Sequence, residues 1–317
     1  MTLLSRRSFL ASASGCAASL AWPSHAQDAW PVRPIQVLVG FPAGGLHDTA
    51  ARVVGTSLSK TLGVSVVVVP TPGAGGAIAL QKLALAAADG YTLMYTPSPA
   101  LLARPHQMSL KISYRDFAPV AMIGTSFPTI SVKQDHRWKT FDDMRSEVAA
   151  NPGKFSYATS GIGGLPHLAM EEILSALQLK VVHVPFQGTP QAIMAALNND
   201  VDVVIGDLPR PEIRSLAVIG DERQAEAPDV PSTKELGLPA ALTAKFMYIG
   251  PRGLPDAAVK AMSAALETAV ADPAVVKHFR TNLITPRFEP ADQMLGWWQD
   301  DEKRYIALID RLELKSK

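Results

Sequence analysis

The sequence predicts an α/β fold of two units that are joined by paired crossing strands. Short apolar runs of strand length alternate with longer amphipathic segments of helical period from Ile35 onward. Glycine-rich turns carry several of these strands into the helix that follows. The chain has 317 residues, of which 47% are hydrophobic, and this is enough for one large core or two medium ones. Such βαβα order favours a mainly parallel sheet with helices on both faces.

The first unit is expected to alternate strands and helices from its start. Residues Ile35–Val39 form a continuous apolar strand, and apolar side chains then recur four apart over residues 50–58, as on one face of a helix. The β-branched run Val64–Val69 is too short for a helix core and is expected to be a buried strand. An Ala/Leu-rich helix over 77–87 and a strand within 89–96 follow.

The second unit repeats this plan after a long strand-like stretch that Pro128 interrupts. Thr140 is placed to cap a helix that a Pro-Gly pair stops. Residues 155–177 read as strand, glycine loop and helix. Residues 181–200 follow the same order, with Thr189 expected at the N-cap and Pro190 at the first helical position.

The last part of the chain is expected to return to the first unit. Two further strands are predicted within 201–207 and 214–220, and residues 245–253 resemble a return strand. Helices are expected over about 255–270 and 291–312. The predicted division is therefore a first lobe of residues 27–126 and 247–317, and a second lobe of residues 127–246.

The N-terminus is predicted to be an export signal rather than part of the fold. Arg6 and Arg7 precede an apolar stretch and a small-residue cleavage pattern that ends at Ala26, so residues 1–26 fit a signal peptide of the twin-arginine type. General secretion and lipidation of Cys16 are the alternatives. Because Cys16 is the one cysteine of the chain, cleavage would leave no thiol for disulfides, nucleophilic catalysis or metal binding.

Charge and histidine spacing exclude several classes of function. The net charge of +1 offers no basic surface for nucleic acid or an anionic membrane. His47, His167 and His183 lack metal-binding spacing, so no metal is expected. The glycine runs fail the dinucleotide fingerprint, no G-x-S-x-G elbow is present, and no cofactor is expected. An exported hydrolase or isomerase would have to use His47, His167, Asp48 or Asp207 as its acid and base.

Four glycine-rich turns lead into predicted helix starts, at residues 41–47, 71–77, 160–167 and 185–190. None of them contains Lys or Arg. Unpaired amides and the helix dipole could therefore supply the positive charge for an anion. The alternative is that these glycines serve ordinary turn chemistry. Asp48 is expected to be a structural cap that reaches back to the Gly45 amide.

An ordered series of motifs resembles the solute-binding receptors of tripartite tricarboxylate transporters, the Bug family. The chain contains "FPAGGLHDTAAR", "PGAGG", "DGYTL", "FSYATSGIGGLPHLAMEE" and "GPRGLP" in the order of that family. The resemblance covers essentially all of the chain after the signal. It implies a two-domain periplasmic binding protein of type II, a Venus flytrap with hinge strands. Such a receptor is a monomer that closes on a small molecule, usually a carboxylate, and passes it to membrane permease subunits.

The resemblance also implies the residues that contact the ligand. Carried over by position, they are Phe41, Pro42, Ala43, Gly44, Gly45, His47, Ser98, Ser160, Gly161, Gly163, Gly164, His167, Phe186, Gly188, Thr189 and Asp207. The stretch "VVVPTPGAGG" departs from the family by lacking a Glu and an Arg beside the loop, which leaves the ligand open. An aromatic carboxylate or a neutral amide fits as well, and the same scaffold could serve a ligand sensor instead of uptake.

Overall fold

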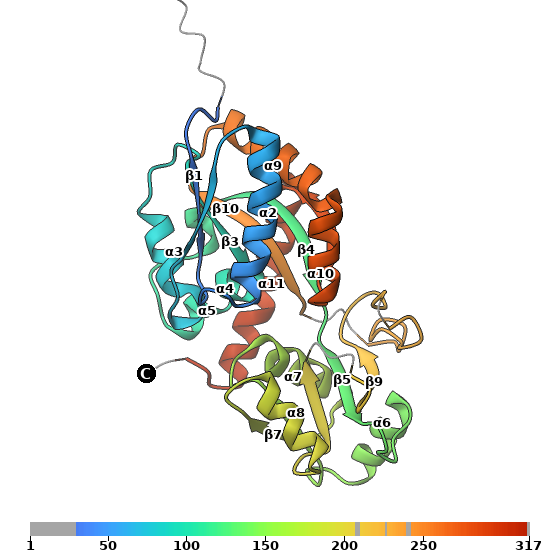
Figure 1. The fold of residues 1–317 in the computed structure, drawn as a ribbon. Helices are drawn as coiled ribbons and strands as arrows, with labels where there is room; N and C mark the ends of the chain where they lie inside the picture. Colours follow the sequence, from blue (N-terminus) through green and yellow to red (C-terminus); the bar gives the residue numbers. More distant parts are fainter. Residues whose placement is uncertain (1–29, 207–209, 226, 239–241, 316–317) are drawn as a thin grey trace, which may run out of the picture.

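The computed structural model describes residues 30–206, 210–225, 227–238 and 242–315. The predicted signal segment 1–26, with Cys16, and the predicted site residue Asp207 lie outside the described residues. Two sheets with their own helices form two lobes, one above the other in Figure 1. In the described part of the chain, no helix combines the length and apolar character that a membrane crossing requires.

The first lobe is built on a six-stranded sheet. Its strands in spatial order are β11 (Thr285–Pro290), β4 (Phe117–Ser126), β10 (Ala244–Pro251), β3 (Thr92–Pro97), β1 (Ile35–Val39) and β2 (Val66–Pro70). Strand β1 is parallel to both β2 and β3, whereas β10 is antiparallel to β3 and β4, and β11 is antiparallel to β4. The prediction of a mainly parallel sheet is therefore wrong, because β10 returns from the second lobe and enters between β3 and β4 in the opposite direction.

Both faces of this sheet are covered by helices. One face packs on α2 (Leu46–Leu62), α9 (Asp256–Ala271) and α10 (Pro273–Thr281), with Val37 and Val54 in the shared core. The other face packs on α3 (Ala77–Ala84), α4 (Ser98–Leu102) and α11 (Ala291–Arg311), with Leu38 and Trp298 buried there. Val37 and Leu38 enter opposite cores because successive side chains of a strand point to opposite faces.

The second lobe is built on a five-stranded mixed sheet. The strand order is β7 (Val182–Pro185), β6 (Ser156–Thr159), β8 (Val203–Gly206), β5 (Thr129–Lys133) and β9 (Ile213–Val218). Helices α6 (Phe141–Ala150) and α7 (Leu165–Leu177) share one core with this sheet, and α8 (Thr189–Leu197) packs on the other face. Strands β6, β7 and β8 are mutually parallel, and β5 is antiparallel to its neighbours.

Two predicted helix caps have different outcomes. The Thr140 hydroxyl accepts a hydrogen bond from the Asp143 amide at 3.1 Å, and the Asp143 carboxylate accepts one from the Thr140 amide at 2.9 Å, so Thr140 caps α6 as predicted. At α8 the cap is Gly188 and Thr189 is the first helical residue, so the prediction of Thr189 as N-cap is wrong. Gly188 has a φ of 130°, a conformation that favours glycine over threonine.

Two chain crossings connect the lobes. Strand β4 ends at Ser126 in the first sheet, and β5 begins at Thr129 in the second. The chain returns to the first sheet at β10, where Ala244 pairs with Ser126. The carbonyl oxygen of Phe127, between β4 and β5, accepts a hydrogen bond of 2.7 Å from the Gln224 side chain. Both crossings therefore meet at one place, and the cavity described next opens beside it.

Candidate ligand-binding site

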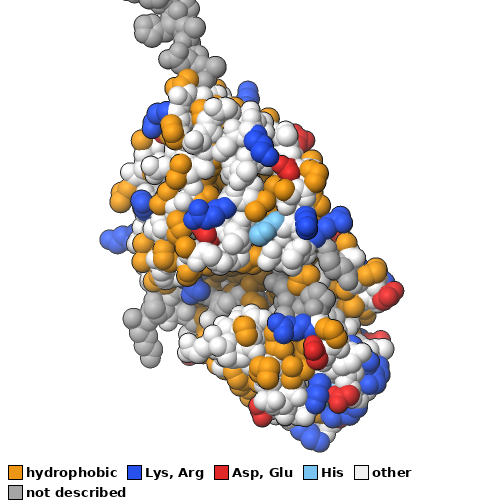
Figure 2. Space-filling view, viewed as in Figure 1, with side chains coloured by type: hydrophobic (Ala, Val, Ile, Leu, Met, Phe, Trp, Pro, Cys, Tyr) orange, Lys and Arg blue, Asp and Glu red, His pale blue; other side chains and the backbone are white. Residues whose placement is uncertain are grey.

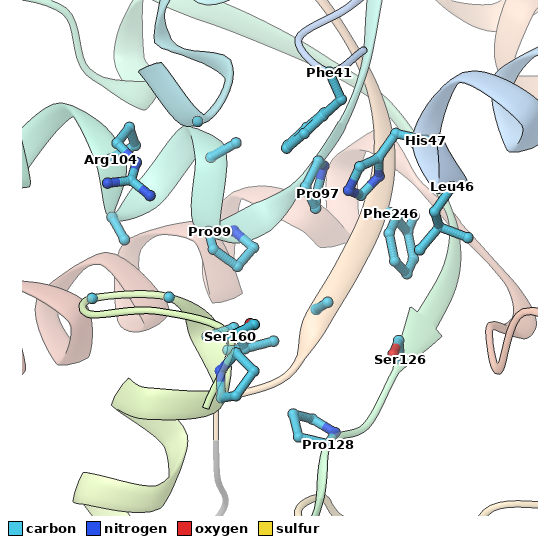
Figure 3. A pocket seen from close by; sticks show the side chains of 18 of the residues that line it. Phe41, Leu46, His47, Pro97, Pro99, Arg104, Ser126, Pro128, Ser160 and Phe246 are labelled. Atoms are coloured by element: carbon cyan, nitrogen blue, oxygen red, sulfur yellow. The ribbon is translucent and has the colours of Figure 1, made fainter. Parts of the chain in front are cut away.

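A cavity of about 320 Å³ lies where the two lobes and the crossing strands meet. Its wall is formed by residues of the loops after β1, β2 and β6, of helices α4 and α5 (Arg104–Gln107), and of strand β10. The lining residues are Phe41, Leu46, His47, Gly75, Pro97, Pro99, Ala100, Ala103, Arg104, Gln107, Ser126, Pro128, Ser160, Gly163, Gly164, Leu165, Pro166, Ala244 and Phe246. Figure 2 shows the surface hollowed between the lobes, and Figure 3 shows most of these side chains at close range.

Aromatic rings form one side of the cavity. The rings of Phe41 and His47 are in contact, with centroids 3.9 Å apart and an interplanar angle of 33°, and the centroid of the Phe246 ring lies 5.8 Å from that of His47. In Figure 3 these three rings and Leu46 lie together, across the cavity from Arg104. Burial lowers the pKa of His47 to about 4, so its imidazole is neutral at neutral pH. This side of the cavity is therefore uncharged and largely apolar.

Asp48, on helix α2, holds the first glycine loop (residues 41–47) by a hydrogen bond to its backbone. Its carboxylate oxygen Oδ2 accepts hydrogen bonds from the Gly44 amide at 2.8 Å and from Arg52 Nε at 2.9 Å. The bond from Arg52, more than the one from Gly44, holds the pKa of Asp48 below its usual value. The neighbouring Gly45 amide donates to the Pro42 carbonyl at 3.2 Å. Asp48 therefore has a structural role, as predicted. The amide that it binds is that of Gly44, whereas the sequence predicted the amide of Gly45.

In the second lobe, His167 holds a glycine loop as Asp48 does in the first, by accepting a hydrogen bond from a loop amide. Its Nδ1 accepts a hydrogen bond of 3.0 Å from the Gly163 amide. The imidazole stacks on His183 with centroids 3.9 Å apart and an interplanar angle of 13°. Burial lowers the pKa of both rings, for His183 to about 4. Two neutral rings therefore hold the loop over residues 160–164 in its position.

Comparison with known proteins places the chain among transport receptors. Residues 50–314 match TctC, the tripartite tricarboxylate transporter family receptor. The chain belongs to this family. Protein BugT of Bordetella pertussis (strain Tohama I) is 30% identical over 301 residues, which are 92% of each chain. Members of the family are periplasmic substrate-binding receptors.

Two solved structures are similar to this TctC-family receptor. A TctC solute-binding protein from Polaromonas, determined without ligand, is 23% identical and has a TM-score of 0.81, covering 89% of this chain and 99% of its own. This likeness shows the two-domain α/β fold. MatC from Rhodopseudomonas palustris, with bound malate, is 26% identical with a TM-score of 0.68 and covers 88% of this chain and 100% of its own.

The TctC-family receptor brings some of the predicted site residues to the cavity. Those that line it are Phe41, His47, Ser160, Gly163 and Gly164. The others that the structure describes stand outside the lining, namely Pro42, Ala43, Gly44, Gly45, Ser98, Gly161, His167, Phe186, Gly188 and Thr189. Ser98 is fully buried, where its hydroxyl donates to the Thr243 carbonyl at 3.3 Å and accepts from the Lys245 amide at 3.2 Å.

Several glycine amides that the sequence suggested as ligand donors already have acceptors. The amides of Gly44 and Gly45 bond within the first loop, and Gly163 donates to His167. The Gly161 amide donates to the Thr159 hydroxyl at 3.3 Å. In this conformation, the expectation of free amides at these four glycines is wrong. The first amides of α2, those of Leu46 and His47, have no intrahelical acceptor because no turn precedes them.

Sequence reasoning missed Arg104 and Gln107, which both line the cavity. The search for positive charge covered the glycine loops, whereas Arg104 begins the short helix α5 that follows β3 and α4. The side-chain amide of Gln107 donates to the Gly163 carbonyl at 2.7 Å, so α5 also contacts the second lobe. An apolar segment directly after a strand, ending in "ARPHQ", is the signal that could have located this wall.

Two of the residues proposed for catalysis, Asp48 and His167, already hold loop amides. Asp48 is bonded to Arg52 and Gly44, and His167 is bonded to the Gly163 amide. In the ranges that the structure describes, no group of three or more His, Cys, Asp or Glu side chains could hold a metal ion. The geometry of the described residues offers a binding cavity and assembles no acid–base pair from His47, Asp48 and His167.

Proposed function

We propose that this protein captures a small carboxylate between its two lobes and delivers it to the permease subunits of a tripartite transporter. The observation that carries the proposal is the cavity of about 320 Å³, which residues of both lobes and of the crossing strands line together. Its volume is at the lower end of the range of about 300–1,000 Å³ that ligand pockets occupy. A ligand held by both lobes favours their closure, and this is the change that a permease can recognise.

Family membership supports the same proposal. The malate bound to MatC is a small carboxylate, and MatC covers 88% of this chain. We propose that the first lobe comprises residues 27–126 and 247–317 and the second residues 127–246, and that residues 1–26 direct export to the periplasm. The receptor acts as a monomer, and the proposal contains no catalytic step.

The direct test is to identify what the exported protein carries. Native mass spectrometry of freshly purified protein is expected to show a small carboxylate, and calorimetry with that compound is expected to give one site per chain. A non-carboxylate ligand, or chemical turnover of the bound molecule, would refute the proposal.

Two matched variants locate the site. Ser160→Trp places a bulky ring at a residue that lines the cavity and is expected to abolish binding. Ile162→Trp makes the same change in the same loop at a side chain that is 62% exposed and outside that lining, so binding is expected to persist. If both variants bind as the unchanged protein does, the ligand lies elsewhere.

A further inference from the structure

The side chain of Arg104 lies against the glycine-rich turn at residues 71–77, in space that Gly75 leaves open. A Cβ atom added to Gly75 would lie 2.6 Å from Arg104 Nε and 2.9 Å from Nη2, closer than side chains tolerate. Gly75 has a φ of +63°, and it lines the cavity together with Arg104. The absence of a side chain at Gly75 therefore lets the guanidinium lie against the loop at the edge of the cavity.

The charge of Arg104 is not neutralised by a carboxylate within the described ranges. Partly buried Arg304 pairs with Glu172 at 2.9 Å, and Arg52 pairs with Asp48 at 2.9 Å, whereas Arg104 forms no ion pair among those residues. Glu313 lines a neighbouring hollow that Arg104 also borders, and the two side chains form no ion pair. Burial lowers the pKa of Arg104, but a guanidinium stays protonated at any pH a protein experiences. An anion in the cavity would offset the cost of this partly buried charge.

The side chains across the cavity from Arg104 carry no second positive charge. Among the described residues that line the cavity, Arg104 is the one Lys or Arg. Across from it stand Phe41, Leu46 and Phe246, with the neutral ring of His47. An ionised carboxylate placed against these side chains would lose its water without gaining a cation. The same rings offer flat apolar faces to a hydrocarbon or aromatic group.

We propose that Arg104 anchors the carboxylate of the ligand and that the ligand is a monocarboxylate with an apolar body, aromatic or aliphatic. The carboxylate binds the guanidinium at the Gly75 edge of the cavity, and the apolar body lies against the rings of Phe41, His47 and Phe246. This inference rests on the proposed function of the site and names the class of its ligand. A receptor of this kind would prefer a monocarboxylate to a dicarboxylate of the same carbon skeleton.

The test compares acids that differ by one carboxylate. Calorimetry on the exported, exhaustively dialysed protein would use benzoate against terephthalate and hexanoate against adipate. Each monocarboxylate is expected to bind at least about tenfold more tightly than its dicarboxylate partner, because burying an unpaired charge costs more than about 1.4 kcal/mol. Tighter binding of both dicarboxylates would overturn the assignment of the ligand class.

Variants of the anchor separate this inference from the proposed function. Arg104→Gln is expected to weaken binding of the monocarboxylate by about tenfold to a hundredfold, since a charge-assisted hydrogen bond is lost. Gly75→Ala keeps the arginine but displaces its guanidinium, and it is expected to weaken binding in the same direction; Ala74 already holds a φ of 50°, so alanine can adopt this backbone. Arg115→Gln, at an exposed arginine outside the cavity lining, is the control and should bind normally.

Each result has a distinct meaning. If carboxylates bind and Arg104→Gln and Gly75→Ala both bind them unchanged, the anchor is refuted while the receptor function stands. If no carboxylate of either class binds and native mass spectrometry finds another compound, the proposed function itself fails. Circular dichroism on every variant shows whether a loss of binding comes from unfolding, and Gly75→Ala carries the test if Arg104→Gln does not fold.

Discussion

The side-chain amide of Gln107 donates a hydrogen bond of 2.7 Å to the carbonyl oxygen of Gly163. This bond joins helix α5 of the first lobe to the glycine loop of the second lobe, directly beside the cavity. Gln107 is 5% exposed, so the bond is shielded from water. Because the Gly163 amide is held by His167, both polar groups of this one residue are satisfied. The Gly163 carbonyl therefore fixes this loop to helix α5 of the first lobe.

Removing this bond is expected to favour separation of the lobes. In Gln107→Ala, the net contribution of one hydrogen bond, about 1 kcal/mol, is lost, and ligand affinity should fall about fivefold. Small-angle X-ray scattering of the ligand-free protein should show a larger radius of gyration, which a mere loss of ligand contact would not produce. Gln299→Ala, at an exposed position of α11, is the control. An unchanged radius of gyration would show that the bond does not hold the lobes together.

The pair of Arg304 and Glu172 is a second link between the lobes. Nη2 of Arg304, on α11, lies 2.9 and 3.0 Å from the two carboxylate oxygens of Glu172 on α7, and Glu172 also accepts from the Leu242 amide at 3.1 Å. Glu172→Gln removes the charge but keeps the shape. A loss of about 1 kcal/mol, and a melting temperature lower by about 2–4 °C, is expected.

An exposed ion pair provides the comparison for that variant. Arg145 and Asp142 lie 2.9 Å apart on α6, with side chains that are 46% and 65% exposed. Arg145→Gln is expected to change the free energy of unfolding by less than about 0.5 kcal/mol, because water screens such pairs. Thermal denaturation of both variants checks this. Equal effects of the two substitutions would show that Glu172 contributes no more than a surface charge.

The sequence predicts local elements of this fold better than their pairing. Strand Ile35–Val39 lies where its apolar run placed it, and the predicted capping of α6 by Thr140 is confirmed. The antiparallel insertion of β10 between β3 and β4 was not predicted, because the partners of a strand depend on a chain crossing that no local pattern encodes. The β-branched run that begins at Val64 enters the sheet only at Val66.

For the cavity too, the sequence predicted residues within local motifs but not residues that only the tertiary fold brings to the site. The glycine-rich turns predict Phe41, His47 and Ser160 as neighbours of a ligand, and all three line the cavity. Arg104 was missed because it reaches the cavity from a helix after β3, far in sequence from the turns. Spacing predicted that Asp48 would accept from a loop amide, but not that the amide would be that of Gly44. That His167 accepts from the Gly163 amide depends on its side-chain conformation, which residue spacing does not determine.

The close approach of Gly40 to Gly76 predicts a strong effect of a single methyl group. A Cβ on Gly40 would lie 2.6 Å from the Gly76 Cα, which is backbone and cannot rotate away. Gly40→Ala is therefore expected to destabilise the protein by about 1–3 kcal/mol, as overpacking does. Gly296→Ala, in the middle of α11 with nothing within 4 Å of the new atom, is expected to stabilise it by about 0.5–1 kcal/mol. Urea denaturation measures both, and a loss of stability in Gly296→Ala would contradict the argument.

Burial of His47 predicts a loss of stability in mild acid. Its pKa is about 4 in the folded protein, against about 6.5 when the chain is unfolded, so the unfolded chain takes up the proton first as the pH falls. The stabilisation is complete above pH ~6.5 and is lost as the pH falls through ~4, with about 2 kcal/mol gone by pH ~5. His47→Phe keeps an aromatic ring against Phe41 and cannot titrate. Its free energy of unfolding, measured by urea denaturation at pH 7 and pH 5, should therefore fall by about 2 kcal/mol less than that of the unchanged protein. Equal losses in the two proteins would show that His47 is solvated rather than buried.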